Sequence, residues 1–261
     1  KESGLAALYL DRMRALVNVY RGVDHEDEMV GLFDYCTFGR GGAAPSIDTA
    51  MHGLVEVSHV DHLHPDSIIA LATAADGEAL TKECFGDEIL WCNWRRPGFQ
   101  LGLDIAKIAR ENPSAKGAIL GGHGLTTWAE SSEECEKRSI SAIEKAEKFL
   151  TSKGRKDPFG SPVMEWAPLS PDARREKAAL LAPALRGIAS LDNPMLGHFN
   201  DSDVVLDFIS HSELKRLAAL GTSCPDHFLR TKISPMVLDT KSSASVEEIV
   251  ARAHELHITY R

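Results

Sequence analysis

Three histidines in two short motifs constrain most strongly what this chain can fold into and bind. His62 and His64 flank a single residue, and His123 follows the apolar run Ala118-Ile119-Leu120 within Gly121-Gly122-His123-Gly124. Residues i and i+2 of a β-strand point to one face, so both imidazoles of the first motif can reach one cation. A third imidazole would complete a three-nitrogen site that leaves a coordination position for substrate, as in catalytic zinc sites. The motifs therefore predict a divalent-metal site; the alternative for His123 is a turn residue between two strands.

The segment around the first motif has the features of a short strand. His59–Pro65 ends in a proline, and Asp66 is a good N-cap for the apolar run Ser67–Ala72. Side chains alternate along such a strand, so Asp61 is expected to point away from His62 and His64.

Composition excludes several classes of function. With 261 residues, 43% of them hydrophobic, the chain can bury the core of one domain, with or without an appendage. A net charge of −9 without a basic stripe argues against nucleic acid as a partner. Five cysteines without CxxC spacing favour reduced thiols in the cytoplasm. Neither a membrane span nor a signal peptide is evident, so we expect a soluble protein.

Apolar periodicity predicts an α/β protein. The helical patterns cover 3–20, 46–57, 66–74, 99–111, 131–151, 172–188, 211–220 and 245–257. The expected strands are 59–64, 88–93, 117–121, 124–127 and 234–238. Ser131 and Glu134 form a capping-box pattern at the start of the longest helix. Because Ser152–Pro171 has no periodicity, we expect a metal-binding domain over 1–155 and a mostly helical extension over 156–261.

The order of motifs resembles that of the class II aldolase/adducin superfamily of metal-dependent sugar-phosphate aldolases and 4-epimerases. Pro45–His52 precedes the first histidine motif, and Gly121–Thr127 contains the second. The resemblance implies an αβα layered sandwich. Three further sequence segments are similar to the aldolase half of bifunctional rhamnulose-1-phosphate aldolase/short-chain dehydrogenase (lactaldehyde dehydrogenase) proteins. They are Trp94–Phe99, Gly197–Phe208 and Gly221–Lys232.

This resemblance implies a lyase that cleaves L-rhamnulose 1-phosphate to dihydroxyacetone phosphate and L-lactaldehyde. Aldol cleavage needs a group that stabilises the enediolate, and Zn²⁺ or another divalent metal on His62, His64 and His123 would do so. Class II aldolases place a glutamate acid/base at the start of the preceding helix, and Asp48 aligns with it. Aspartate is one methylene shorter, and its alternative role is a first-turn acid favoured by the helix dipole. Otherwise the acid/base role would fall to an acidic residue after the histidine strand, namely Glu83, Asp87 or Glu88.

Substrate-binding residues are less constrained by the sequence. Cationic candidates for the substrate phosphate are Arg95, Arg96, Arg230 and Lys232, against the alternative of solvated surface. The turn Cys224–His227 is a further candidate for anion binding, against a structural cap or a subunit contact. His52, four residues after Asp48, shares its helix face and is placed to orient it.

Two other functions stay open at this stage. One is a class II aldolase or 4-epimerase acting on another sugar phosphate, and the other is a non-catalytic adducin-like interaction domain. The family resemblance also implies a homo-oligomer, most simply a tetramer, whose site borrows a tyrosine from a neighbour: Tyr9, Tyr20 or Tyr35. It implies a glycine-rich phosphate-binding segment upstream and a dehydrogenase half, neither of which is found here. We therefore expect a fragment or shortened form that binds metal but cleaves phosphorylated ketoses poorly.

Overall fold

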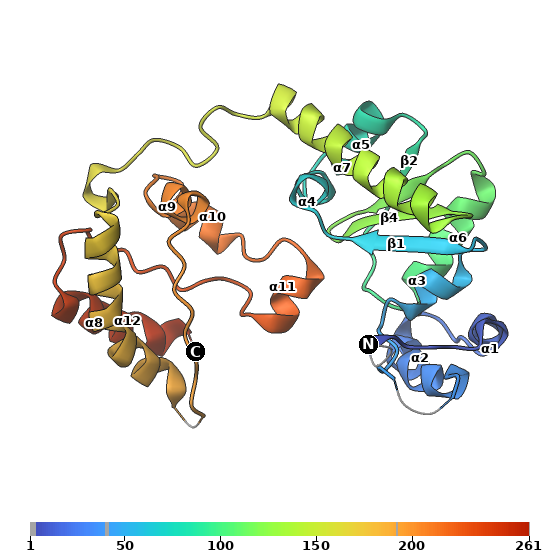
Figure 1. Ribbon diagram of the computed structural model, residues 1–261, viewed down its shortest axis with the longest axis horizontal. Helices are drawn as coiled ribbons and strands as arrows, with labels where there is room; N and C mark the ends of the chain where they lie inside the picture. Colours follow the sequence, from blue (N-terminus) through green and yellow to red (C-terminus); the bar gives the residue numbers. More distant parts are fainter. Residues whose placement is uncertain (1–3, 40–41, 192, 261) are drawn as a thin grey trace. The chain divides into compact units, whose positions relative to one another are not determined.

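The computed structural model describes residues 4–39, 42–191 and 193–260, except for the side chains of residues 226, 228 and 229. Its contacts divide the chain into two compact units (Figure 1). Unit 1 comprises Lys1–Lys153 and Ser223–His227, and unit 2 comprises Gly154–Thr222 and Phe228–Arg261. The predicted boundary between residues 155 and 156 concerns domains that fold independently, and it stays a prediction.

A four-stranded sheet forms the centre of unit 1. Its strands are β1 (His59–Leu63), β2 (Ile89–Cys92), β3 (Gly117–Leu120) and β4 (Gly124–Ala129), in the order β1-β4-β3-β2. The pairs β1/β4 and β4/β3 are antiparallel, whereas β3 and β2 are parallel. The register places His62 opposite Thr126 and Asp61 opposite Thr127. The strand that carries the first histidine motif therefore lies directly beside the strand that follows the second.

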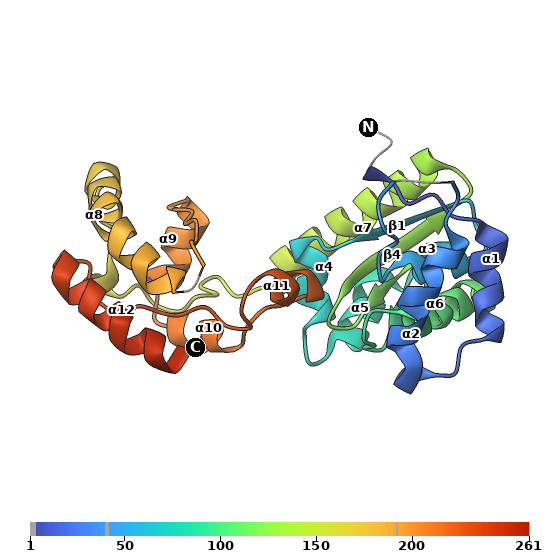
Figure 2. The ribbon, with the colours of Figure 1, turned by 90° about the horizontal axis from the view of Figure 1, so that it is seen from below.

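Helices cover both faces of this sheet (Figures 1 and 2). The face that bears α3 (Thr49–Leu54) and α6 (Phe99–Glu111) also carries α1 (Leu10–Ala15) and α2 (Glu26–Leu32). The opposite face is covered by α4 (Asp66–Ala72), α5 (Gly77–Phe85) and α7 (Ser132–Lys153). Short 3-10 turns occur at Leu16–Asn18, Val23–His25 and Phe33–Cys36. The predicted αβα sandwich is confirmed.

Strand periodicity divides the core of unit 1 into two apolar layers. On β3, Ala118 and Leu120 enter the layer under α3 and α6, while Ile119 enters the layer under α4, α5 and α7. One of the two hydrogen bonds of the predicted capping box forms. The backbone N–H of Glu134 donates to Ser131 Oγ at 3.2 Å, but the Glu134 carboxylate accepts from Arg138 at 3.0 Å.

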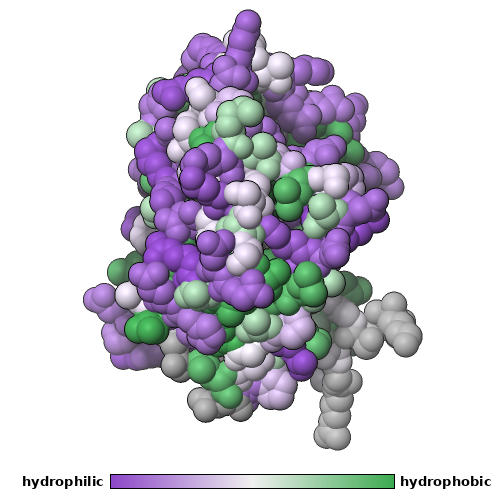
Figure 3. All heavy atoms as spheres, turned by 90° about the vertical axis from the view of Figure 1, so that its left-hand side faces the viewer, coloured by the Kyte–Doolittle hydropathy of each residue, from purple (hydrophilic) through white to green (hydrophobic). Residues whose placement is uncertain are grey.

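Unit 2 is mostly helical, as expected for the C-terminal part. It contains a 3-10 turn at Met164–Trp166, α8 (Pro171–Ser190), α9 (Asp203–Ile209), α10 (Leu214–Ala219) and α12 (Val246–Tyr260), and α8 packs on α12. The short helix α11 (Pro225–Arg230) begins in the segment that belongs to unit 1. Figure 3 shows a largely hydrophilic face of the molecule, interrupted by hydrophobic patches.

Several predicted elements differ from the structure. The strand expected at 234–238 is wrong: this segment has no partner strand and Pro235 has no N–H to donate. Helices α2, α5, α9 and α11 were not predicted. Ser3, where the first helical pattern was expected to begin, lies outside the described residues, and α1 begins at Leu10. Within the described ranges, no helix has both the length and the apolar character needed to cross a membrane.

Candidate metal centre

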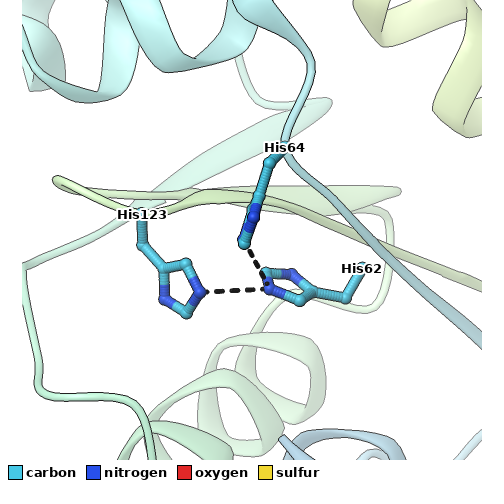
Figure 4. Close-up of side chains that lie close together, drawn as sticks. All are labelled: His62, His64 and His123. Carbon is cyan, nitrogen blue, oxygen red and sulfur yellow. Dashed lines mark hydrogen bonds between the residues drawn. The ribbon is translucent and has the colours of Figure 1, made fainter. Parts of the chain in front are cut away.

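The side chains of His62, His64 and His123 converge on one point (Figure 4). The Nε2 atom of His62 lies 3.1 Å from Nε2 of His123 and 3.0 Å from Nε2 of His64. One ring nitrogen from each histidine lies within 4.8 Å of the other two. Two motifs about sixty residues apart in the sequence thus supply three nitrogens to a single position.

Hydrogen bonding fixes which nitrogen of His62 faces its neighbours. Nδ1 lies 2.9 Å from the carbonyl oxygen of Leu125, so Nδ1–H donates and Nε2 keeps its lone pair. A metal-binding histidine commonly donates its other ring N–H to a carbonyl in this way. Burial, followed by the charges of His123 and His64, lowers the pKa of His62 to about 3. The neutral form, which is the one that binds metal, is therefore favoured.

The glycines of the second motif permit this convergence. Gly122 adopts φ +64°, which favours glycine, in the turn that carries His123 between β3 and β4. A Cβ on Gly124 would lie 2.4 Å from His64 Cδ2 and 2.6 Å from the Leu63 carbonyl oxygen. A Cβ on Gly121 would lie 2.7 Å from the Trp91 ring. Each glycine therefore removes a side chain where the backbone passes close to a neighbour.

The donor set fits a divalent cation. Tetrahedral zinc with Zn–N bonds of about 2.0–2.1 Å needs nitrogens about 3.3–3.4 Å apart, close to the two separations given above. His123 is only 2% exposed, and His62 and His64 are partly buried. Three neutral imidazoles would leave the full charge of the cation available to a substrate. The geometry suits a catalytic ion with an open coordination position better than a closed structural site.

Asp48 lies at the N-terminus of α3, the helix next to this centre. Its backbone N–H donates to Ser46 Oγ at 3.2 Å, and its side chain is partly buried. One turn later, Met51 Sδ accepts from Thr126 Oγ1 at 2.9 Å, and Thr126 Oγ1 is 3.3 Å from His62 Nδ1. His52 on the same helix acts electrostatically on His62. Helix α3 therefore packs on the sheet face that bears the histidines.

Asp61 points away from the histidines, as strand alternation predicts. Its carboxylate accepts from Ser139 Oγ of α7 at 3.1 Å, on the opposite face of the sheet. Ser139 in turn lies 2.7 Å from Thr127 Oγ1. Asp61 therefore belongs to a polar group that ties β1 and β4 to α7.

The other acidic candidates and the cationic candidates form contacts elsewhere. Glu83 pairs with Lys153, Asp87 with Lys82, and Glu88 with both Lys116 and Lys145. Arg95 pairs with Asp104 at 2.8 Å, and Arg96 pairs with Asp27. In unit 2, Arg230 is exposed and Lys232 donates to the Tyr260 carbonyl at 3.3 Å. A substrate phosphate would have to compete with acidic side chains for both candidate arginines of unit 1, Arg95 and Arg96.

Sequence reasoning missed two groups around the centre. The carbonyl of Leu125 and the hydroxyl of Thr126 both face His62 Nδ1. Their position follows from the β1/β4 register, which cannot be inferred from one motif alone.

Sequence reasoning also missed Glu26, a buried carboxylate that accepts from Tyr20 Oη at 2.6 Å and from the Gln100 N–H at 3.0 Å. Tyr20 is therefore engaged within its own chain, whereas Tyr35 is 74% exposed and Tyr9 is 38% exposed.

Comparison with known proteins gives matches over most of the chain. Residues 12–150 match the family model of the class II aldolase and adducin N-terminal domain, and residues 176–261 match that of the second domain of class II aldolase. YuxG of Bacillus subtilis (strain 168), named an uncharacterized oxidoreductase, is 33% identical over 240 residues, which cover 92% of this chain. The matched region spans only 34% of the length of YuxG.

Two solved structures are similar to part of this chain. The N-terminal class II aldolase domain of a conserved protein from Thermoplasma acidophilum aligns over 55% of this chain and 65% of that chain, with 22% identity and a TM-score of 0.48. An aldolase II superfamily protein from Pseudomonas syringae aligns over 45% of this chain and 49% of its own, with 21% identity and a TM-score of 0.34. At these scores neither structure adds to what the family models establish. The match over 12–150 covers the sheet and all three histidines, and the chain therefore belongs to the class II aldolase and adducin family.

Proposed function

We propose that this chain is a metal-dependent aldehyde-lyase whose His62, His64 and His123 bind one Zn²⁺ or a similar divalent ion. The observation that carries the proposal is the convergence of three Nε2 atoms while His62 Nδ1 donates to the Leu125 carbonyl. A non-catalytic adducin-like interaction domain has no need of three such ligands. The arrangement therefore favours catalysis over a purely structural role.

The chemistry divides between the ion and Asp48. When bound, a divalent cation supplies Lewis-acid polarisation of a ketone and its neighbouring hydroxyl group. We assign to Asp48 the transfer of the proton at the carbon next to that ketone. Its position at the start of α3, the helix whose Met51 contacts Thr126 beside His62, supports this role. His52 shares the Asp48 face of α3 and is assigned to its orientation.

We further propose L-rhamnulose 1-phosphate as the substrate and dihydroxyacetone phosphate and L-lactaldehyde as the products. This substrate is supported by three sequence segments that resemble the rhamnulose-1-phosphate aldolase half of the bifunctional proteins: Trp94–Phe99, Gly197–Phe208 and Gly221–Lys232. A relative named an oxidoreductase, of which this chain spans about a third, accords with an aldolase region inside a longer bifunctional protein. The net charge of −9 means that local cations, with Arg95 and Arg96 as candidates, would have to bind the phosphate.

We also propose that the chain assembles into a homo-oligomer, a tetramer in the simplest case. Tyr35 is exposed and available to a neighbouring copy, which would then share in the site. Light scattering at micromolar concentration should give a mass above that of one chain. A monomer under these conditions would remove the shared-site argument without affecting the metal centre.

The test combines metal analysis with product release. Purified protein should contain about one equivalent of divalent metal and release dihydroxyacetone phosphate from L-rhamnulose 1-phosphate at a low but measurable rate, with loss of release after chelation. His62→Ala should abolish both properties, whereas His59→Ala, which changes an exposed histidine of the same strand, should keep the metal. Protein that never binds a divalent ion would refute the proposal. Cleavage of a different ketose 1-phosphate would overturn only the assigned substrate.

A further inference from the structure

Unit 2 contains a cavity, partly open to solvent, that the metal centre does not explain. Its volume is about 470 Å³, and its wall comes from α8, α9, α10, α12 and the extended segment 235–242. This size lies within the range of small-molecule binding pockets. Most lining side chains are apolar, among them Trp166, Leu206, Phe208, Leu214 and Met236.

The cavity lies where the helices of unit 2 would otherwise bury a core. Both large hydrophobic clusters of the described residues belong to unit 1. Among the described side chains of unit 2, the buried apolar residues are Ile188, Leu214, Ala218, Ile249 and Ala253, and three of these line the cavity. An apolar guest would therefore remove from water an apolar surface that the unit leaves uncovered, which is favourable through the hydrophobic effect.

Among the described residues that line the cavity, every charged side chain but one forms an ion pair. Asp239 pairs with Lys215 and Arg252, and Arg174 pairs with Asp201 at 3.0 Å. Lys241 pairs with Glu165 at 2.6 Å.

Lys177 is the exception. Its Nζ donates to the carbonyl oxygens of Ser242 at 2.9 Å and of Ala244 at 2.7 Å, which satisfies two N–H groups but supplies no opposite charge. An ammonium group has three N–H donors, so one remains for a further acceptor. A partly buried cation at an apolar wall is best matched by a single anionic group.

We propose that this cavity binds an amphipathic monocarboxylate, with its hydrocarbon body against the apolar wall and its carboxylate on Lys177. This site is independent of the metal centre, because all its lining residues belong to unit 2.

Decanoate is a suitable probe, with decanol as the uncharged comparison. Trp166 lines the cavity and the other tryptophans, Trp91, Trp94 and Trp128, belong to unit 1, so Trp166 fluorescence reports on occupancy. We expect a saturable change with decanoate that is lost in Trp166→Phe. Lys177→Met should weaken decanoate binding about tenfold or more, because the charge-assisted hydrogen bond to the carboxylate is lost, and should weaken decanol binding far less, although the variant also loses the hydrogen bonds to Ser242 and Ala244. Lys107→Met, the same change at an exposed lysine of unit 1, should have no effect.

A second variant keeps the proposal testable if Lys177→Met fails to fold. Ala218 is 6% exposed and lines the cavity, so Ala218→Leu should reduce its volume without removing the ammonium group. We expect this variant to bind decanoate more weakly while octanoate or hexanoate loses less affinity. No saturable response to decanoate in the wild-type protein, or equal decanoate affinity in wild type, Lys177→Met and Ala218→Leu, would overturn the proposal.

Discussion

At the scale of single residues, the metal centre depends as much on missing side chains as on the imidazoles. His64 lies just beyond the end of β1, and its ring passes over the backbone of Gly124. Any Cβ at position 124 would meet both a ring carbon of His64 and the carbonyl oxygen of Leu63. The ring can rotate away from such a contact, but the carbonyl belongs to the strand that holds His62. Glycine at this position is therefore a requirement of the centre.

We predict that Gly124→Ala weakens metal binding at least tenfold and lowers the free energy of unfolding by about 1–3 kcal/mol, as expected for overpacking. Metal titration and urea unfolding would measure the two effects. Gly31→Ala is the matched control: it lies in α2, where an added Cβ would meet no heavy atom within 4 Å, so it should be neutral or slightly stabilising. Unchanged metal affinity in Gly124→Ala would show that the end of β1 accommodates the methyl group.

We predict that Asp48→Asn lowers turnover about 10²-fold or more while metal content stays normal, because the amide cannot transfer the proton. Asp76→Asn is the control, since Asp76 also precedes a helix without a side-chain capping bond. Turnover and metal content should be measured on the same preparations. Near wild-type turnover of Asp48→Asn would transfer the acid/base role to another group.

The residues of the centre were the part of the site best predicted from sequence. Strand alternation was enough to pair His62 with His64 and to turn Asp61 toward α7. The contacts of Arg95 and Arg96 were not predictable, because Asp104 and Asp27 reach them from α6 and α2. Long cationic side chains find acidic partners through tertiary packing, which periodicity in one sequence does not reveal.

At the scale of elements, a buried carboxylate connects α2 to α6. Glu26 is 6% exposed, and its Oε1 accepts the N–H of Gln100 in the first turn of α6. The N-cap residue of this helix is Gly98, which has no side chain to cap it. A Cβ there would lie 2.2 Å from Glu26 Oε1, so the glycine makes room for a carboxylate from another helix. Negative charge at a helix N-terminus is also favoured by the helix dipole.

We predict that Glu26→Gln lowers the free energy of unfolding by about 1–3 kcal/mol, because the amide nitrogen cannot accept one of the two hydrogen bonds. Urea unfolding of unit 1, followed by circular dichroism, would measure the loss. Glu28→Gln changes an exposed residue of the same helix that pairs with Arg21, and should change stability much less than Glu26→Gln does, because water screens an exposed ion pair. Equal stability of the two variants would mean that the carboxylate does not cap α6.

Elements were predictable in proportion to the strength of their local signals. The helix α7 has a capping serine and a long apolar stripe, and its predicted bounds of 131–151 differ little from Ser132–Lys153. The short helix α5 was missed because it has only nine residues and begins at a glycine, Gly77. The segment 234–238 has an apolar run typical of a strand, yet its residues 235–238 line the cavity of unit 2 instead. Whether an apolar segment pairs or packs depends on partners elsewhere in the chain.

At the scale of the whole molecule, the two units are stabilised differently. Unit 1 has two apolar layers around its sheet, whereas unit 2 relies more on polar links between its elements. The main link is Asp239, whose carboxylate accepts from Arg252 of α12 and Lys215 of α10, each at 2.8 Å. Arg252 first, and then Lys215, hold the pKa of Asp239 well below its usual range.

This shift gives unit 2 a pH dependence of defined sign. Because the pKa of Asp239 is lower in the folded state, its stabilising contribution is fully present above the unfolded value of about 3.9 and is lost as pH falls toward the folded value. We predict that Asp239→Asn destabilises unit 2 at pH 7 and flattens the decline in stability between about pH 5 and pH 3. Urea unfolding monitored through Trp166 fluorescence would measure both effects.

The control for the Asp239→Asn prediction must remove one negative charge without disturbing the contact of Asp239 with Lys215 and Arg252. Asp172→Asn does so, since Asp172 is exposed in the first turn of α8. It should leave the acid decline of unit 2 close to that of the wild-type protein. If Asp239→Asn declined as steeply as Asp172→Asn, the acid sensitivity of unit 2 would belong to other carboxylates. The three-way contact of Asp239, Lys215 and Arg252 would then position these elements without stabilising them, because exchange with water would offset its electrostatic gain.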